Sequence, residues 1–243
     1  MNTILVIILL SFLSGITTLI GVWFAFKINK DTKFIVGGLG FSAGIMLLIP
    51  FFELLPESIK ATTLSTALIS LGAGCLLIFS LNFIIPHTHL IEERGKLGKL
   101  TGFAFLVAFG LILHDFPEGF AMANSFIYKP ALGVLVALSI AIHNIPEEYA
   151  MAVPLILTGK KKLTYKLAFL SALAEPAGAV VGLIAVSFFV KLNPVFMAFA
   201  AGAMIFISVH ELIPFAVKYK KPFVLIFGFL VSIIVYSFLT YLI

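Results

Sequence analysis

The sequence predicts an all-α polytopic membrane protein with eight transmembrane helices in a 3+2+3 inverted-repeat arrangement. Three observations lead to this prediction. The 243 residues are 61% hydrophobic and only 11% charged, whereas soluble domains carry about 25% charged residues. The apolar segments are long enough to cross a bilayer, and short polar connections separate them. Two sequence patterns each occur twice, in segments that are expected to be different helices.

A transmembrane helix needs about 20 mainly apolar residues. We therefore expect a single transmembrane domain over residues 1–243, in which short connections make neighbouring helices antiparallel. The first apolar segment is longer than the core of a signal peptide, so we expect it to be a spanning helix. The expected helices cover residues 3–26, 34–56, 64–85, 101–127, 131–157, 163–190, 194–216 and 222–243, and the longest connection covers residues 86–100.

The distribution of Lys and Arg predicts the orientation in the membrane. Thirteen of the sixteen basic residues lie in the first, third, fifth and seventh connections, and only Lys60, Lys129 and Lys191 lie on the other side. Because short basic loops remain in the cytoplasm, the loop 86–100 is expected to be cytoplasmic and both termini extracytoplasmic. We expect a multi-pass protein of the cell (inner) membrane. The scattered basic residues do not indicate a nucleic-acid partner, and the single Cys75 excludes a disulfide framework.

Acidic residues lie inside the expected helices without basic partners. No Lys or Arg lies deep in a span, although seven acids do: Glu53, Asp115, Glu118, Glu147, Glu148, Glu175 and Glu211. A charged side chain at mid-membrane costs at least about 2.5 kcal/mol, so these groups must be protonated, hydrated or bound to cations. We expect a cation as the missing partner. For a lone acid such as Glu53, a protonated carboxyl that hydrogen bonds to a neighbouring helix is the alternative.

A polar motif occurs in two neighbouring expected helices. The first copy, HDFPEG, begins at His114, and the second, HNIPEE, begins at His143. Residues three or four apart are neighbours on a helix surface, so each copy brings imidazole, carboxylate and a further polar group together. The tight connection at residues 129–130 makes the two helices antiparallel neighbours, and we expect their polar faces to meet at one depth. Pro117 and Pro146 each free a backbone carbonyl as an additional ligand.

Imidazole, carboxylate and amide groups without a thiolate suit zinc, iron, manganese, cobalt and cadmium. Glu118 and Glu147 are expected to face each other, so each could bridge two metal ions. Such ligands fit a metal transporter, an intramembrane metal-dependent hydrolase or a proton-coupled metal exporter. The spread of acids over five expected helices favours a path through the membrane, and the hydrolase motif H-E-x-x-H is absent.

A second pattern relates the two ends of the chain. Residues 41–56, FSAGIMLLIPFFELLP, match residues 199–214, FAAGAMIFISVHELIP, at eight of sixteen positions in register. The loop charges make these two helices run in opposite directions, so the repeat is inverted. With the two motif helices as the central pair, the plan is three helices, two, then three. Inverted repeats with a polar site at mid-membrane are typical of alternating-access transporters.

These features together resemble the ZIP (Zrt/Irt-like) family of divalent-metal transporters, especially its bacterial members, over essentially the whole chain. The resemblance implies that the protein takes up divalent metal ions into the cytoplasm, with zinc as the main substrate. It also implies that the protein is not an enzyme and needs no cofactor. It also implies an elevator-like sliding of the first, fourth, fifth and sixth helices against the rest. It implies that the metal ligands are His114, Asp115, Glu118, His143, Asn144 and Glu147, with Glu175 of Ala174-Glu175-Pro176 as a further ligand.

The sequence departs from the family pattern at two positions. Asp115 stands where many relatives have Asn, and Glu148 stands where bacterial relatives usually have Gly. We expect the extra carboxylate of Glu148, together with Met46, to influence metal selectivity. Residues expected along the path or at its exit are Glu53, His210, Glu211, His87 and His89. The expected partners are divalent metal ions and the lipid bilayer, with a homodimer as a possible assembly.

Overall fold

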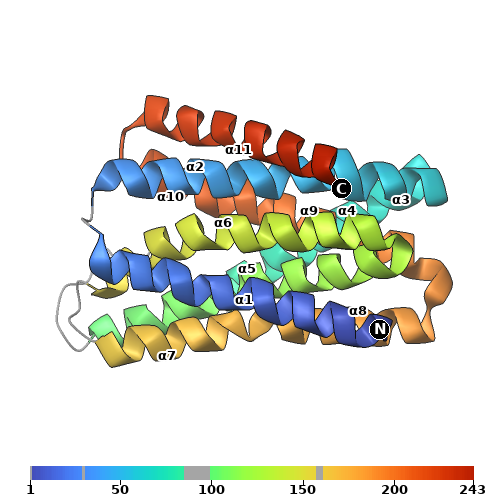
Figure 1. Cartoon of the computed structure of the whole chain (residues 1–243), viewed down its shortest axis with the longest axis horizontal. Coiled ribbons are helices and arrows are strands. Elements are labelled where there is room, and N and C mark those ends of the chain that lie inside the picture. The colour runs from blue at the N-terminus through green and yellow to red at the C-terminus, as the bar shows by residue number, and fades with distance from the viewer. Residues whose placement is uncertain (1, 29–30, 85–98, 157–160) are drawn as a thin grey trace.

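Long helices that run roughly along one direction make up the described part of the chain (Figure 1). The computed structural model describes residues 2–28, 31–84, 99–156 and 161–243, without side-chain detail at 83–84, 99–109, 111 and 154–155. These ranges contain no strand. The all-helical fold expected from the sequence is therefore confirmed.

The helices follow one another with short connections. Their bounds are α1 Thr3–Lys27, α2 Thr32–Ile49, η1 Pro50–Leu54, α3 Leu55–Ala61, α4 Leu64–Ile84, α5 Lys99–Tyr128, α6 Pro130–Ile156, α7 Lys161–Ala172, α8 Ala174–Phe188, η3 Val190–Leu192, α9 Asn193–Ile207, η4 Ser208–Leu212, α10 Ile213–Val217 and α11 Pro222–Leu242. Seven stretches of the described residues are long and apolar enough to cross a membrane: Thr3–Lys27, Thr32–Ala61, Leu64–Asn82, Pro130–Val153, Lys161–Phe188, Val190–Val217 and Pro222–Leu242. The helix α5, which carries the HDFPEG motif, is a further long helix of 30 residues.

Two π-helical turns interrupt the helices that contain the sequence repeat. In η1 the amide of Leu55 donates to the carbonyl of Pro50, and in η4 the amide of Ile213 donates to the carbonyl of Ser208. Both turns begin at the same register of the repeat, since Pro50 aligns with Ser208. The likeness between the two halves therefore extends from sequence to backbone. Each turn contains a glutamate, and such turns are frequent at functional sites.

The sixth expected helix, 163–190, is two helices rather than one. α7 ends at Ala172, α8 begins at Ala174, and a single turn residue, Leu173, lies between them. Pro176 explains the break, because it has no N–H to donate to the carbonyl of Ala172 and its ring crowds that carbonyl. Pro117, in contrast, lies within the continuous helix α5.

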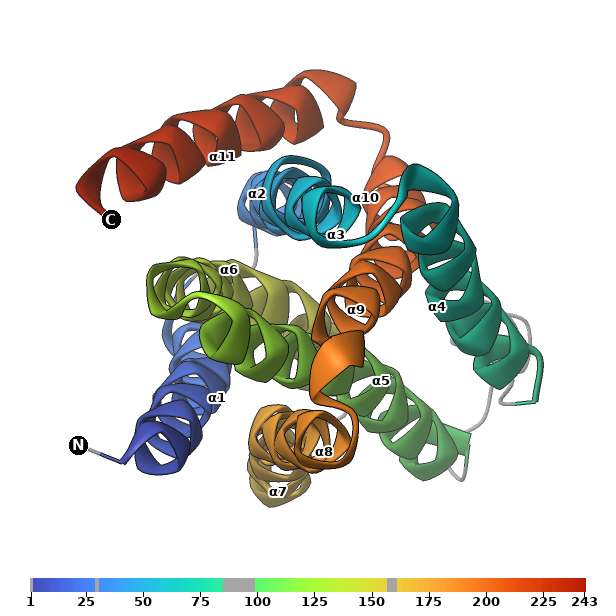
Figure 2. The same cartoon turned by 90° about the vertical axis from the view of Figure 1, so that its right-hand side faces the viewer.

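The motif helices α5 and α6 lie at the centre of the bundle (Figure 2). α1 packs along α6, and α8 packs along α5. On the other side, α2 packs along α11 and against α6, whereas α9 packs along α4 and against α5. α11 and α4 lie at the periphery (Figure 2). The central pair is therefore covered by two sets of helices with corresponding neighbours.

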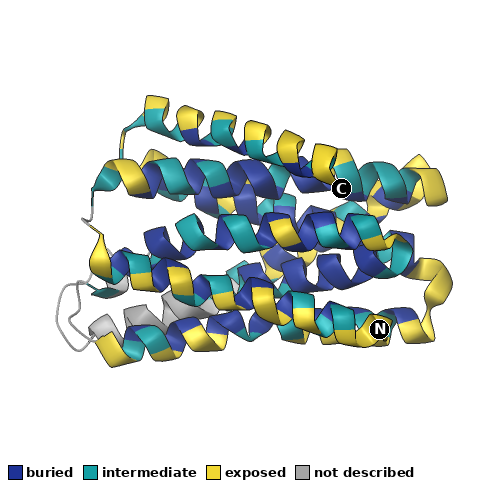
Figure 3. Ribbon diagram, in the orientation of Figure 1, coloured by how far each residue is buried: buried dark blue, intermediate teal, exposed yellow. Residues whose placement is uncertain are grey.

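The outside of the bundle is apolar, and polar groups are buried inside it. α11 and α1 are exposed along much of their length (Figure 3), and large apolar side chains such as Ile69 and Phe223 are 74% and 87% exposed. An apolar surface of this extent is unusual for a water-soluble protein. Both termini lie toward the same end of the bundle, opposite the α10–α11 connection (Figure 1).

Candidate metal site

The seven expected metal ligands are all buried within the bundle, and none is more than 4% exposed. His114, Asp115 and Glu118 lie on α5. His143, Asn144 and Glu147 lie on α6, and Glu175 is the second residue of α8. The helix break after Ala172 therefore places the start of α8 at the depth of the two motifs.

Two glycines allow α8 to approach α5 closely at this depth. A Cβ atom on Gly119 would lie 1.9 Å from the carbonyl oxygen of Glu175, and one on Gly178 would lie 2.0 Å from the carbonyl oxygen of Phe116. Small residues permit such backbone contact between membrane helices. The contact places Glu175 directly beside the α5 motif.

Both motif histidines are oriented in the same way. Nδ1 of His143 lies 2.9 Å from the carbonyl oxygen of Ser139, and Nδ1 of His114 lies 2.6 Å from that of Gly110. A carbonyl only accepts hydrogen bonds, so Nδ1 carries the proton in each ring. In each ring Nε2 is then the nitrogen available to a cation. Hydrogen bonds of this kind fix the ring orientation of metal-binding histidines.

The Nε2 atoms of these histidines face carboxylates. Nε2 of His143 lies 3.1 Å from Oε1 of Glu118 and 3.8 Å from Oε2 of Glu147. Nε2 of His114 lies 3.3 Å from Oε2 of Glu211. An unprotonated Nε2 and an ionised carboxylate both accept, so a proton or a metal ion must lie between them. We call these five residues the imidazole cluster.

A second group of polar residues contains no imidazole. The Ser171 hydroxyl donates to Oδ2 of Asp115 at 2.5 Å, and the Asn144 amide donates to Oε1 of Glu175 at 2.5 Å. The Ser14 hydroxyl of α1 donates to the other Glu175 oxygen. We call these five residues the carboxylate cluster. Ser14 and Ser171 were not expected from the sequence, because a single hydroxyl in an apolar helix also fits simple packing.

Glu118 and Glu148 lie close to members of the carboxylate cluster, and Glu118 also contacts His143 of the imidazole cluster. Glu118 contacts His143 and also interacts electrostatically with Asp115 and Glu175. Adjacent helix residues point about 100° apart, and Glu148 accordingly lies near Asp115 rather than with Glu147 at His143. The clusters therefore form one polar layer, with Glu118 between them.

The expected path residues lie in different environments. Glu211 accepts a 2.8 Å hydrogen bond from Asn82 of α4 and approaches His114. His210 is exposed, with its ring stacked on Phe206 at 4.4 Å between centroids, so it lies apart from the partners of Glu211. Met46 is fully buried in the apolar core. His87 and His89 lie outside the described residues.

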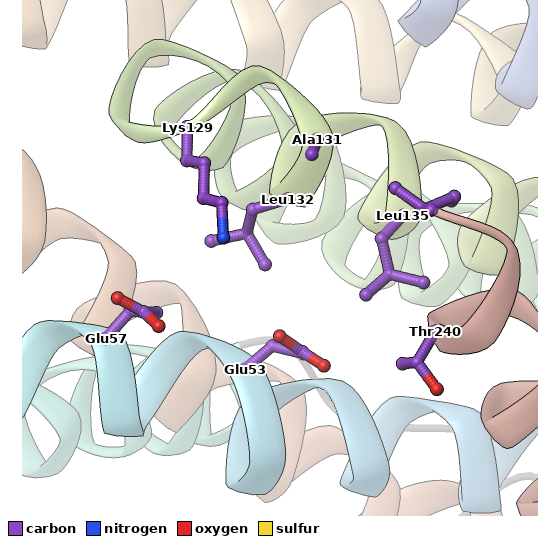
Figure 4. Close-up of a pocket in the computed structure, with 8 residues that line it drawn as sticks. Glu53, Glu57, Lys129, Ala131, Leu132, Leu135 and Thr240 are labelled. Atoms are coloured by element: carbon purple, nitrogen blue, oxygen red, sulfur yellow. The ribbon is translucent and has the colours of Figure 1, made fainter.

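Glu53 lies beside a cavity rather than beside a histidine. The Tyr236 hydroxyl of α11 donates to Oε1 of Glu53 at 2.5 Å. Across a cavity of about 150 Å³, Glu53 and Glu57 face Lys129 and the first turns of α6 (Figure 4). Glu57 is paired with Lys60 at 2.9 Å. Glu53 and Glu57 thus both line a cavity near one end of the bundle.

Within the described residues, no three His, Cys, Asp or Glu side chains are already grouped as a metal site. The carboxylates instead bond to hydroxyl, amide and imidazole groups. The ligand set remains a prediction.

Comparison with known proteins points to one family. Residues 87–240 match the family model described as ZIP zinc transporter. The chain is 36% identical to the zinc transporter ZupT of Corynebacterium aurimucosum, over 92% of this chain and 91% of that protein. It is 35% identical to the ZupT of Chlorobium phaeovibrioides over 97% of both chains. It is 37% identical to the ZupT of Streptococcus mutans over 90% of both chains.

Proposed function

Since the chain belongs to the ZIP zinc transporter family, we propose that it takes up zinc and other divalent transition metals through the two clusters. Membership of the family makes it a multi-pass transporter of divalent metal ions rather than an enzyme. The finer proposal concerns the ligands, the number of ions and the way in which the protein moves them.

The observation that carries the proposal is the matched arrangement of the two histidines. In both motifs Nδ1 is bonded to a carbonyl, and Nε2 faces a glutamate that is at most 14% exposed. No Lys or Arg of the described residues pairs with Glu118. A cation with mixed nitrogen and oxygen ligands fits this environment, and zinc, iron, manganese, cobalt and cadmium have that preference.

A binuclear site is the arrangement that we propose. The imidazole cluster would hold one ion, and Asp115, Asn144 and Glu175 would hold a second. Glu118 interacts with both groups, which supports a role for it in bridging the ions. Glu147, which interacts with the rest of the imidazole cluster, is the second bridging residue that we propose. Carboxylates have enough lone-pair sites for this role.

The corresponding contacts of the two halves support an inverted repeat that works by alternating access. The two π-helical turns share one register, and each contains a glutamate that accepts from a peripheral helix. Glu53 accepts from Tyr236 of α11, and Glu211 accepts from Asn82 of α4. We propose that α11 and α4 are counterparts, as expected for three helices, two, then three.

The packing also suggests which helices move together. α1, α5, α6, α7 and α8 contact one another, whereas α2 packs with α11 and α4 packs with α9. The two groups meet mainly where α2 contacts α6 and α9 contacts α5. We propose that the first group slides against the second, with Glu53 on the path from outside and Glu211 on the path to the cytoplasm. The basic connections would lie in the cytoplasm and the termini outside the cell membrane.

Uptake by purified protein in sealed vesicles tests the proposal. We expect saturable Zn²⁺ uptake that Cd²⁺, Fe²⁺, Mn²⁺ and Co²⁺ inhibit by competition. Glu118→Gln should abolish it, whereas the control Asp31→Asn should not, because Asn also caps the start of α2 as Asp31 does. Wild-type uptake by Glu118→Gln would overturn the ligand assignment. Net export from loaded vesicles, with the protein inserted in one orientation, would instead support the exporter.

A further inference from the structure

We propose that Thr18, Asp115, Glu148 and Ser171 form an additional site for a divalent cation that prefers oxygen ligands. These four residues, from α1, α5, α6 and α7, are called the Glu148 site below. The inference rests on the proposed transport function, and it adds an ion beside those held by the two clusters. Asp115 is the one residue that the Glu148 site shares with the carboxylate cluster.

The Glu148 site is anionic and has no basic partner among the described residues. Glu148 is 2% exposed and Asp115 is 4% exposed. Their electrostatic neighbours include Glu118 and Glu175, which are carboxyls as well. Neither forms an ion pair with Lys, Arg or His in the described ranges. Two buried carboxyls at this depth therefore require either protons or a cation.

One hydroxyl is shared between the two carboxyls. Ser171 donates to Oδ2 of Asp115 at 2.5 Å and also lies within hydrogen-bonding reach of Glu148. A serine hydroxyl has one proton to donate, so it cannot serve both acceptors. The two carboxyls therefore have too few hydrogen-bond donors, and Oε1 of Glu148 is buried without a hydrogen-bond partner.

Thr18 contributes a second oxygen without a partner. Its side chain is fully buried, and Oγ1 has no hydrogen-bond partner. On the same face of α1, Ser14 bonds to Glu175, and a Cβ atom on Gly21 would lie 2.8 Å from Cβ of Glu148. Thr18 lies between these two contacts, one turn from each. Its hydroxyl is therefore on the face that meets Glu148 and Ser171.

The break between α7 and α8 brings the end of α7 into this region. The last carbonyls of α7 lack partners within their helix, and the helix ends at Ala172, directly after Ser171. A Cβ atom on Gly15 of α1 would lie 2.3 Å from the carbonyl oxygen of Ala172, so this end of α7 lies against α1. Broken membrane helices provide cation ligands in this way.

The ligand chemistry differs from that of the imidazole cluster. The Glu148 site offers carboxylate and hydroxyl oxygens and no nitrogen or sulfur atom. Oxygen-only sites suit Mg²⁺, Ca²⁺ and Mn²⁺, whereas imidazole suits zinc. Mn²⁺ is the probe that we choose, because it accepts oxygen ligands and can be counted directly.

The test counts Mn²⁺ ions bound per purified full-length chain by equilibrium dialysis and elemental analysis. Four proteins are compared: the wild type, Glu148→Gln, His143→Ala and the double variant. We expect Glu148→Gln to remove one Mn²⁺ ion from the wild type and one from His143→Ala. The same number of ions with and without Glu148→Gln overturns the inference and indicates a protonated Glu148 instead.

A neighbouring pair of threonines provides a matched control. Thr18→Val removes the buried hydroxyl without changing the side-chain volume, and it should weaken this Mn²⁺ site by about tenfold or more. Thr17→Val should leave it unchanged, because the Thr17 hydroxyl donates to the Ser14 carbonyl of its own helix at 2.6 Å. Equal Mn²⁺ affinity of the two variants overturns the role of Thr18.

Zn²⁺ uptake by the wild type separates the two proposals. Uptake with an unchanged Mn²⁺ count in Glu148→Gln overturns the Glu148 site alone. If Glu148→Gln binds one Mn²⁺ ion fewer but the wild type takes up no Zn²⁺, the Glu148 site is supported and the transport function proposed above is overturned.

Discussion

Gly119→Ala should strongly reduce metal uptake, because the added methyl group forces α5 and α8 apart at the depth of the site. The added Cβ atom would lie 1.9 Å from the carbonyl oxygen of Glu175, whereas ordinary van der Waals contact begins at 3.4 Å. The two backbones would have to separate by the difference, about 1.5 Å. Glu118 precedes Gly119 on α5, so this separation moves Glu118 away from Glu175.

The size of the displacement decides the size of the effect. Binding sites tolerate errors of about 0.5 Å in the positions of their side chains, and a misplacement of about 1 Å can cost about 100-fold in activity. We therefore expect uptake to fall by about 100-fold or more. Overpacking of this kind also costs about 1–3 kcal/mol of stability, so the unfolding temperature should fall as well.

Gly72 provides the matched control for this substitution. It is exposed on α4, and a Cβ atom there would meet nothing within 4 Å. Gly72→Ala should keep wild-type uptake and gain about 0.5–1 kcal/mol of stability, because alanine is the better helix former. The assay is the initial rate of Zn²⁺ uptake per mole of reconstituted protein, together with the unfolding temperature. Wild-type uptake by folded Gly119→Ala would refute the packing argument.

Three further predictions concern the ligands. Glu118→Ala or Glu147→Ala should remove most uptake while expression of the protein, measured by fluorescence-detected size exclusion, stays intact. Ser14→Ala should weaken Zn²⁺ binding by about 10- to 100-fold, because Glu175 loses a donor; Ser11→Ala, whose hydroxyl bonds within its own helix, should bind Zn²⁺ like the wild type. Apparent Zn²⁺ affinity, measured without a pH gradient, should weaken from about pH 8 to about pH 5, since the ligands must lose protons to bind. A flat profile would contradict the ligand assignment.

The sequence was sufficient for the features that depend on local chemistry. Apolar segments of membrane-spanning length predicted an all-helical chain, because a backbone in lipid must bond within its own helix. The repeat at 41–56 and 199–214 pointed to related helices, and both contain a π-helical turn at one register. The angular step of an α-helix required that Glu147 and Glu148 point in different directions.

Contacts between distant helices could not be predicted from the sequence. Nothing in the spacing of the motifs pairs His114 with Glu211, because that contact depends on how α9 and η4 pack beside α5. His210 and Glu211 were both expected along the path or at its exit, yet His210 is exposed and stacks on Phe206. The break at Leu173 was also not expected. The sequence does not show whether a proline such as Pro176 lies inside a continuous helix or at the start of a new one.

The buried atoms that lack hydrogen-bond partners indicate where the bundle can accept a cation. Small donors satisfy some carboxylate oxygens, as Ser14 and Asn144 do for Glu175. Buried atoms of the two motif helices that lack a hydrogen bond include Nε2 of His114 and one carboxylate oxygen each of Glu118, Glu147 and Glu148. Leaving such atoms without partners in a low-dielectric interior is costly, and a cation would satisfy several of them at once. These atoms therefore supply part of the driving force for binding an ion.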